Sequence, residues 1–98
     1  MAYIYKHTRV DKGEIFYIGI GNQDQYKRAF VTQKRNKFWK NITSKTEYIV
    51  EIIEDGLTWE EAQAKEIKLI AQYGRKDLGL GTLVNLTDGG EGTIGIIH

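Results

Sequence analysis

The chain of 98 residues contains no cysteine and no proline. Without cysteine there is no disulfide partner, no thiolate zinc site and no cysteine nucleophile, so any metal must bind oxygen atoms or histidine. No apolar run approaches the roughly 18 residues that span a bilayer, and the N-terminus lacks the charged-then-apolar pattern of a secretory signal. We therefore expect no membrane partner and a cytoplasmic, intracellular protein. This length supports one modest core, which predicts a single domain over residues 1–98.

Acidic residues are also missing from one long stretch of the chain. Between Asp24 and Glu47 there is none, although the formal net charge of the whole chain is only +1. A basic block of this kind on a folded domain forms a positive patch that attracts a polyanion such as nucleic acid, while a solvated face without a partner is the alternative. The basic residues in this stretch are Lys27, Arg28, Lys34, Arg35, Lys37, Lys40 and Lys45.

Two runs rich in β-branched and aromatic residues, 3–10 and 14–20, predict a hairpin. A two-residue turn would place Tyr5 and Tyr17 on opposite faces, whereas a three-residue loop with a left-handed Gly13 pairs His7 with Tyr17. We favour the longer loop, which pairs Val10 with Glu14, because it gathers the apolar side chains on one face. That register predicts a core face of Ile4, Val10, Phe16, Ile18 and Ile20. It predicts an opposite face of Tyr3, Tyr5, His7, Arg9 and Tyr17, with Gly19 and Gly21 beside Tyr5.

The rest of the chain predicts two short helices, a third strand and a long helix. The short helices begin near Asp24 and near Asn36, and the strand covers 47–54 before a turn at 55–56. Thr58 and Glu61 form a capping box for the long helix, which ends at Gly74. The order strand, strand, helix, helix, strand, helix indicates an α+β fold.

Glu66 lies in the middle of the apolar arc of the long helix, at about 100° per residue. An ionised carboxylate on a core-facing side needs a cation, a donor network or a gap that opens to water. An ion pair with a nearby arginine or lysine is one interpretation, and a metal or catalytic role is the other. The apolar residues of the same arc are Trp59, Ala62, Leu69, Ile70 and Tyr73.

The tripeptides Tyr3-Ile4-Tyr5 and Tyr17-Ile18-Gly19 are followed by an arginine, a helical glutamate and a late asparagine. This ordered set resembles the GIY-YIG nuclease family over nearly the whole chain. The resemblance implies a three-stranded antiparallel sheet flanked by helices, and metal-dependent hydrolysis of DNA phosphodiesters to 5′-phosphate and 3′-hydroxyl ends. Two positions depart from the pattern: Tyr3 replaces the opening glycine, and Thr32 stands where some members carry histidine.

Carried onto this sequence, the resemblance implies catalytic roles for Tyr5, Tyr17, Arg28, Glu66 and Asn85. Tyr5 would be the general base if neighbouring cations favour its phenolate, and Tyr17 would orient the water or the phosphate. Arg28 would bind the phosphate, Glu66 would hold one Mg²⁺ or Mn²⁺, and Asn85 would tie the late loop to the active face. His7 and Arg35 are the candidates for helping the leaving group. The predicted nucleic-acid contacts are His7, Lys34, Arg35, Lys37 and Lys40.

Three functions remain as hypotheses at this point. The first is a bare catalytic domain of a phage or bacterial homing-type endonuclease. The second is a nucleic-acid-binding module of the same fold without cleavage, for which the basic stretch alone suffices. The third is an interaction domain that uses the aromatic face.

Overall fold

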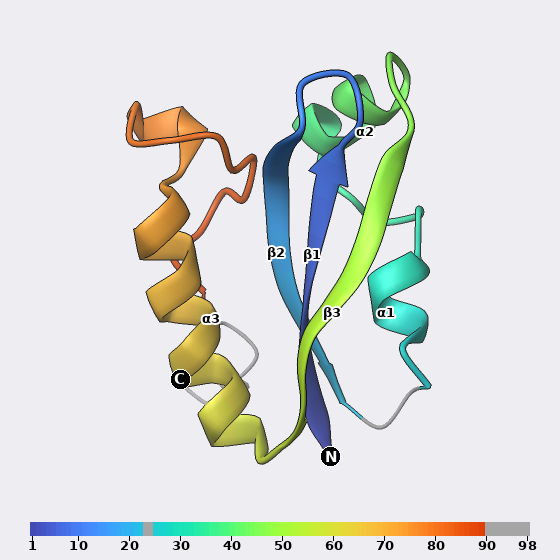
Figure 1. Cartoon of the computed structure of the whole chain (residues 1–98). Coiled ribbons are helices and arrows are strands. Elements are labelled where there is room, and N and C mark those ends of the chain that lie inside the picture. Colours follow the sequence, from blue (N-terminus) through green and yellow to red (C-terminus); the bar gives the residue numbers. More distant parts are fainter. Residues whose placement is uncertain (23–24, 90–98) are drawn as a thin grey trace.

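The computed structural model describes residues 1–22 and 25–89, which form an α+β fold (Figure 1). Three antiparallel strands, β1 (Ala2–Arg9), β2 (Glu14–Asn22) and β3 (Tyr48–Leu57), lie in the order β2-β1-β3. The helices are α1 (Lys27–Phe30), α2 (Lys37–Thr43) and α3 (Trp59–Tyr73), with a short 3-10 helix, η1 (Lys76–Leu78), after them. The predicted fold class and element order are therefore confirmed. Within the described ranges no helix is both long and apolar enough to cross a membrane.

Helices cover both faces of the sheet, so the central strand β1 is buried on each side (Figure 1). α3 lies over one face, where its buried Ala62 and Ile70 join a core cluster with Ile4 and Ile18. α1 and α2 lie on the other side, where the aromatic side chains of β1 and β2 gather. The two-residue period of the strand thus sends apolar residues to α3 and aromatic residues to α1 and α2.

The hairpin register is the predicted one at the aromatic face and differs near the loop. His7 pairs with Tyr17, and Gly13 has a φ of 63°, both as expected. A β-bulge then shifts the pairing, so Arg9, and not Val10, pairs with Glu14. Val10 is 54% exposed and does not belong to the core, contrary to the prediction.

The bulge also changes the face on which Phe16 lies. Phe16 and Tyr17 together oppose His7, so β2 has one residue more than β1 at this point. The extra residue reverses which side chains of β2 face each side of the sheet between the bulge and the hairpin loop. Phe16 therefore packs with Trp39 in the aromatic cluster. Ile15 packs against the α3 core, in the place that was predicted for Phe16. The predicted face for Phe16 was wrong because residue alternation alone cannot reveal a bulge.

Two other element boundaries differ from prediction. β3 continues through the expected turn at 55–56 to Leu57, with irregular pairing opposite Ala2 to Tyr5. α1 begins only at Lys27, because Gln25 and Tyr26 are left-handed; the predicted start at Asp24 lies outside the described residues. The start of α2 at Lys37 after Asn36, the capping box of α3 and its end at Gly74 agree with prediction.

His7 links the sheet to both short helices and is fully buried. Its Nε2 lies 2.7 Å from the carbonyl oxygen of Ala29, and the Trp39 Nε1–H donates to its Nδ1 at 2.9 Å. Because the carbonyl can only accept and the indole can only donate, His7 must be the neutral tautomer with its proton on Nε2. Burial lowers the pKa of His7 to about 4.

This buried histidine predicts a loss of stability in mild acid. The pKa of His7 is 6.5 in the unfolded chain and about 4 in the native protein. Between these two pH values the unfolded state binds a proton that the native state does not bind. Stability should fall by about 2 kcal/mol between pH 7 and pH 5. Urea unfolding across this range measures it, and His7→Gln should remove most of the pH dependence. An equal pH dependence in that variant would contradict the assignment.

Candidate active site

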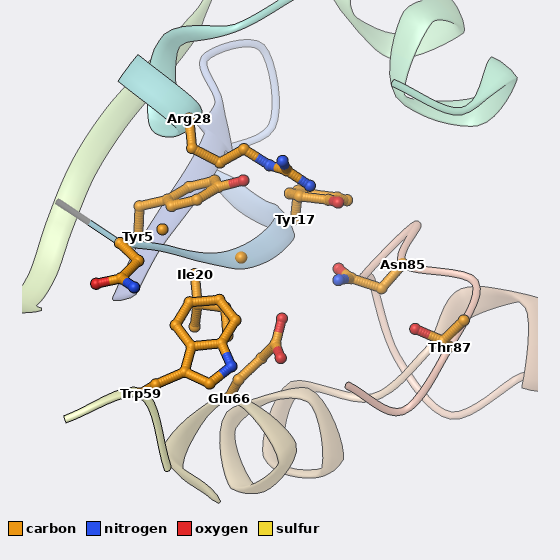
Figure 2. A pocket seen from close by; sticks show the side chains of 11 residues that line it. Tyr5, Tyr17, Ile20, Arg28, Trp59, Glu66, Asn85 and Thr87 are labelled. Carbon is orange, nitrogen blue, oxygen red and sulfur yellow. The ribbon is translucent and has the colours of Figure 1, made fainter. Parts of the chain in front are cut away.

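A cavity of about 490 Å³ lies beside the edge strand β2 (Figure 2). Residues of α1, on one face of the sheet, and of α3, on the other face, both line it. All five residues with predicted catalytic roles line it, and they come from β1, β2, α1, α3 and the loop after η1. Figure 2 shows Tyr5, Tyr17 and Arg28 on one wall, and Glu66 with Trp59 on the opposite wall. The five are Tyr5, Tyr17, Arg28, Glu66 and Asn85.

The two phenols lie on the same face of the sheet. Their ring centroids are 6.4 Å apart, with 30° between the planes. The ring of Tyr5 crosses over its partner Gly19, where an added Cβ would lie only 2.3 Å from the phenol oxygen. The missing side chain at Gly19 therefore lets Tyr5 reach across β2 to the cavity at its edge.

The surroundings of Tyr5 in the free protein favour its neutral phenol over the phenolate that a general base requires. Tyr5 is 1% exposed, and burial raises its pKa above the usual 10; the nearby Arg35 guanidinium lowers the pKa but does not outweigh burial. Two other basic side chains of β1 form ion pairs away from Tyr5: Lys6 with Glu51, and Arg9 with Asp11. Tyr5 is therefore a neutral phenol at neutral pH in the free protein.

Glu66 belongs to α3 and reaches the cavity from the apolar face of the sheet. Its side chain is half-buried and turned toward the cavity (Figure 2). Gly89 packs against it, since a Cβ built there would lie 3.1 Å from Oε1. The inward position expected from the helical period is thus confirmed, and the carboxylate is at the edge of the core and within reach of solvent.

Asn85 joins the late loop to β2 with both groups of its amide. The Ile18 N–H donates to Oδ1 at 3.1 Å, and Nδ2 donates to the Ile18 carbonyl at 2.7 Å. The Val84 N–H adds a bond to the Phe16 carbonyl at 2.8 Å. The Asn85 side chain thus satisfies backbone groups of β2 that a neighbouring strand would otherwise bind at this edge of the sheet. These hydrogen bonds connect the late loop to the sheet, as predicted.

The predicted nucleic-acid contacts separate into exposed and inward-facing residues. Lys34, Lys37 and Lys40 are exposed and available to a large anion. His7 is buried with both ring nitrogens engaged, so it neither contacts DNA nor helps a leaving group, contrary to prediction. Arg35 is half-buried and donates to the Tyr5 hydroxyl, and its contact with flanking phosphates stays a prediction.

Trp59 and Thr87, two residues from outside β2, also line the cavity and were not predicted as site residues. Trp59 lies two helical turns before Glu66, a spacing that places both on one side of α3. Thr87 follows Asn85 by two residues and adds a hydroxyl to the same wall (Figure 2). The shared arc of Trp59 and Glu66 was a signal in the sequence, whereas the irregular loop around Thr87 offered none.

The donor set of the cavity fits one kind of cation. Among the described residues there is no group of three or more histidine, aspartate and glutamate side chains that would enclose a metal. A single carboxylate with neutral oxygens nearby suits a hard cation such as Mg²⁺, which keeps several water ligands and binds through one or two carboxylates plus substrate phosphate. It does not suit a closed site made only of protein ligands.

Comparisons with protein-family models, curated proteins and solved structures gave no match.

Removal of the Asn85 amide should weaken the fold and the site together. Asn85→Ala leaves the Ile18 backbone groups without partners, which predicts a loss of about 1–3 kcal/mol in the free energy of unfolding. Asn85→Asp can still accept from the Ile18 N–H but cannot donate when ionised, so it should be destabilising as well. Urea unfolding measures both, with Asn41→Ala on the exposed side of α2 as the control. Wild-type stability in both variants would contradict the tie.

Proposed function

We propose that this chain is a divalent-metal-dependent DNA endonuclease that hydrolyses phosphodiesters to 5′-phosphate and 3′-hydroxyl ends. The observation that carries the proposal is the convergence of two phenols, a guanidinium and a carboxylate on one cavity. They come from segments far apart in the chain, which a purely structural role for each would not require. The resemblance to GIY-YIG nucleases supports the same function, as a compact homing-type catalytic domain that acts on DNA inside a phage-infected or bacterial cell.

Hydrolysis of a phosphodiester needs charge stabilisation, which two side chains of the cavity provide. Arg28 is exposed at the rim and presents a planar fork that matches two phosphate oxygens. Glu66 would hold one Mg²⁺ or Mn²⁺, which when bound neutralises charge on the phosphate and makes it a better electrophile. The two side chains lie on opposite walls, so the phosphate would sit between them (Figure 2).

The phenols supply the groups nearest to the attacking water. Tyr5 is proposed as the general base that accepts the proton of this water, for which its phenol must first be ionised. Tyr17 is half-buried beside it and would orient the water or donate to the phosphate. Because burial raises the pKa of Tyr5, only a small fraction of the free protein carries the phenolate at neutral pH.

A second cavity continues the positive surface next to the first. It has a volume of about 330 Å³ and shares Tyr17 and Arg28 with the proposed active site. Its other lining residues include Lys34 and Arg35 and no acidic side chain. We propose that the DNA strand passes along this side, with Lys34, Lys37 and Lys40 contacting flanking phosphates in a salt-dependent and sequence-independent way.

A nucleic-acid-binding module without cleavage is the second candidate. The observation in its favour is the raised pKa of Tyr5, because a phenol that stays protonated is a poor base. The exposed lysines would serve binding equally well in either case. Cleavage activity therefore separates the two candidates.

Plasmid nicking in Mg²⁺ or Mn²⁺ tests the proposed function. Tyr5→Phe, Arg28→Ala and Glu66→Ala should each reduce the rate about 100-fold or more, because each removes a group that acts on the reacting phosphate or water. Glu60→Ala, an exposed glutamate in the first turn of the same helix, is the matched control and should retain activity.

The outcomes of this assay are distinct. No nicking by the wild type, with DNA retained in a gel shift, would support the binding module. A wild type that neither nicks nor retains DNA would support the third hypothesis, an interaction domain that uses the aromatic face. Equal losses in Glu60→Ala and Glu66→Ala would show that the effect is not specific to the cavity.

The rate should also depend on pH in a manner set by Tyr5. Because a base must be deprotonated and burial raises the pKa of this phenol, kcat/KM should increase about tenfold per pH unit from pH 7 toward pH 9.5. Steady-state kinetics on an oligonucleotide with Mg²⁺ measures this slope, and Tyr73→Phe on α3 should leave it unchanged. A flat profile would assign the base to another group.

A further inference from the structure

All three nitrogens of the Arg35 guanidinium donate hydrogen bonds within the protein. Nε donates to the Val31 carbonyl at 2.9 Å, and Nη2 donates to the Arg28 carbonyl at 2.5 Å. These carbonyls lie at the C-terminal end of α1, where helical partners run out. Nη1 donates to the Tyr5 hydroxyl oxygen at 2.9 Å. Arg35 therefore connects the end of α1 directly to a phenol of the active-site cavity.

The same guanidinium lies among three aromatic rings. Its central carbon is 5.6 Å from the ring centroid of Tyr5, 5.1 Å from that of Tyr17 and 5.5 Å from that of Trp39. A cation at such distances is attracted to the ring faces, and a planar fork loses little freedom when its donors are fixed. Both phenols are thus held by one side chain that is itself anchored on the backbone.

The hydrogen bond at Tyr5 also has a directional effect. The phenol oxygen accepts from Arg35, so its own proton cannot point along that bond. The oxygen lies over Gly19, a residue of the cavity wall. The other lone pair of the Tyr5 oxygen and its proton are therefore available to groups other than Arg35. Arg35 also donates to the carbonyl of Arg28, the proposed phosphate ligand.

We propose that Arg35 is a positioning residue of the active site, which fixes Tyr5, Tyr17 and the backbone of Arg28 in one arrangement and is not itself a phosphate contact. Its catalytic consequence rests on the proposed nuclease function. Its effect on Tyr5 does not, because that effect is present in the free protein.

The first test follows the ionisation of Tyr5 without any cleavage. 3-Fluorotyrosine at position 5, whose phenol is more acidic than that of tyrosine, is titrated by ¹⁹F NMR in the wild type, Arg35→Met and Lys34→Met. Since burial raises the pKa of Tyr5 and Arg35 opposes this, Arg35→Met should move the midpoint to higher pH and shift the resonance. Lys34→Met removes an equal charge from the exposed neighbouring residue and should leave both unchanged.

The second test separates positioning from phosphate binding. Arg35→Met should lower kcat about tenfold or more with little change in KM, because a misplaced group slows the reaction without weakening binding. Lys34→Met should instead weaken DNA binding and reduce its salt slope by about one. Arg35→Lys keeps the charge without the fork, so it should restore part of the Tyr5 titration but little of kcat.

Each remaining outcome decides the proposal. An unchanged Tyr5 titration in Arg35→Met, with a reduced salt slope of DNA binding, would overturn it and return Arg35 to the role of a phosphate contact. If Arg35→Met does not fold, Arg35→Lys carries the same comparison, and wild-type titration together with wild-type kcat would overturn the proposal. If the wild type does not cleave DNA, the proposed function fails, while the titration still decides the role of Arg35 at Tyr5.

Discussion

The central strand β1 carries polar aromatic side chains that are buried, and the layout of the site depends on how their polar atoms are satisfied. Tyr5 and His7 are almost completely removed from solvent, and burying an unpaired hydroxyl or imidazole would cost several kcal/mol. His7 is satisfied by Ala29 and Trp39, and Tyr5 by Arg35. Among the described residues no buried side-chain polar atom lacks a hydrogen-bond partner. These bonds hold α1, α2 and the segment between them against the sheet, and so build one wall of the cavity.

The bulge in β2 resolves a conflict between two kinds of packing. Regular alternation would send Phe16 toward α3 and remove it from the aromatic cluster around Trp39. One extra residue lets Phe16 join Trp39 while Tyr17 remains opposite His7, and from Ile18 onward the apolar residues face α3. The strand edge after the bulge is then free to accept the amide of Asn85. The same local irregularity thus supports the core and brings the late loop to the cavity.

The sequence was sufficient for features that depend on local chemistry. Thr58 and Glu61 define the start of α3 through a capping box that needs no tertiary contact, and the helical period places Glu66 inward. The pairing of His7 with Tyr17 followed from the demand for one apolar face. The face of Phe16 could not be predicted, because the bulge that moves it depends on its tertiary contact with Trp39, which lies far along the chain.

The role of the cations was beyond the sequence for a related reason. Lys34 and Arg35 are adjacent and equally charged, yet one is exposed and the other turns toward the aromatic face. The difference arises because two carbonyls at the end of α1, a phenol oxygen and three ring faces converge on one point, and only a planar fork can meet them together. A basic stretch in a sequence predicts a positive surface, but it does not show which of its side chains form hydrogen bonds within the protein instead.

Rigid placement and chemical reactivity are opposed at Tyr5. The packing that fixes the phenol over Gly19 also excludes water, and exclusion of water disfavours the phenolate. The half-buried Arg35 donates to the Tyr5 oxygen and reduces this penalty, whereas Arg28 lies exposed at the rim of the cavity. Arg35 thus acts on the protein's own phenols, and the proposed contact with a substrate phosphate falls to Arg28.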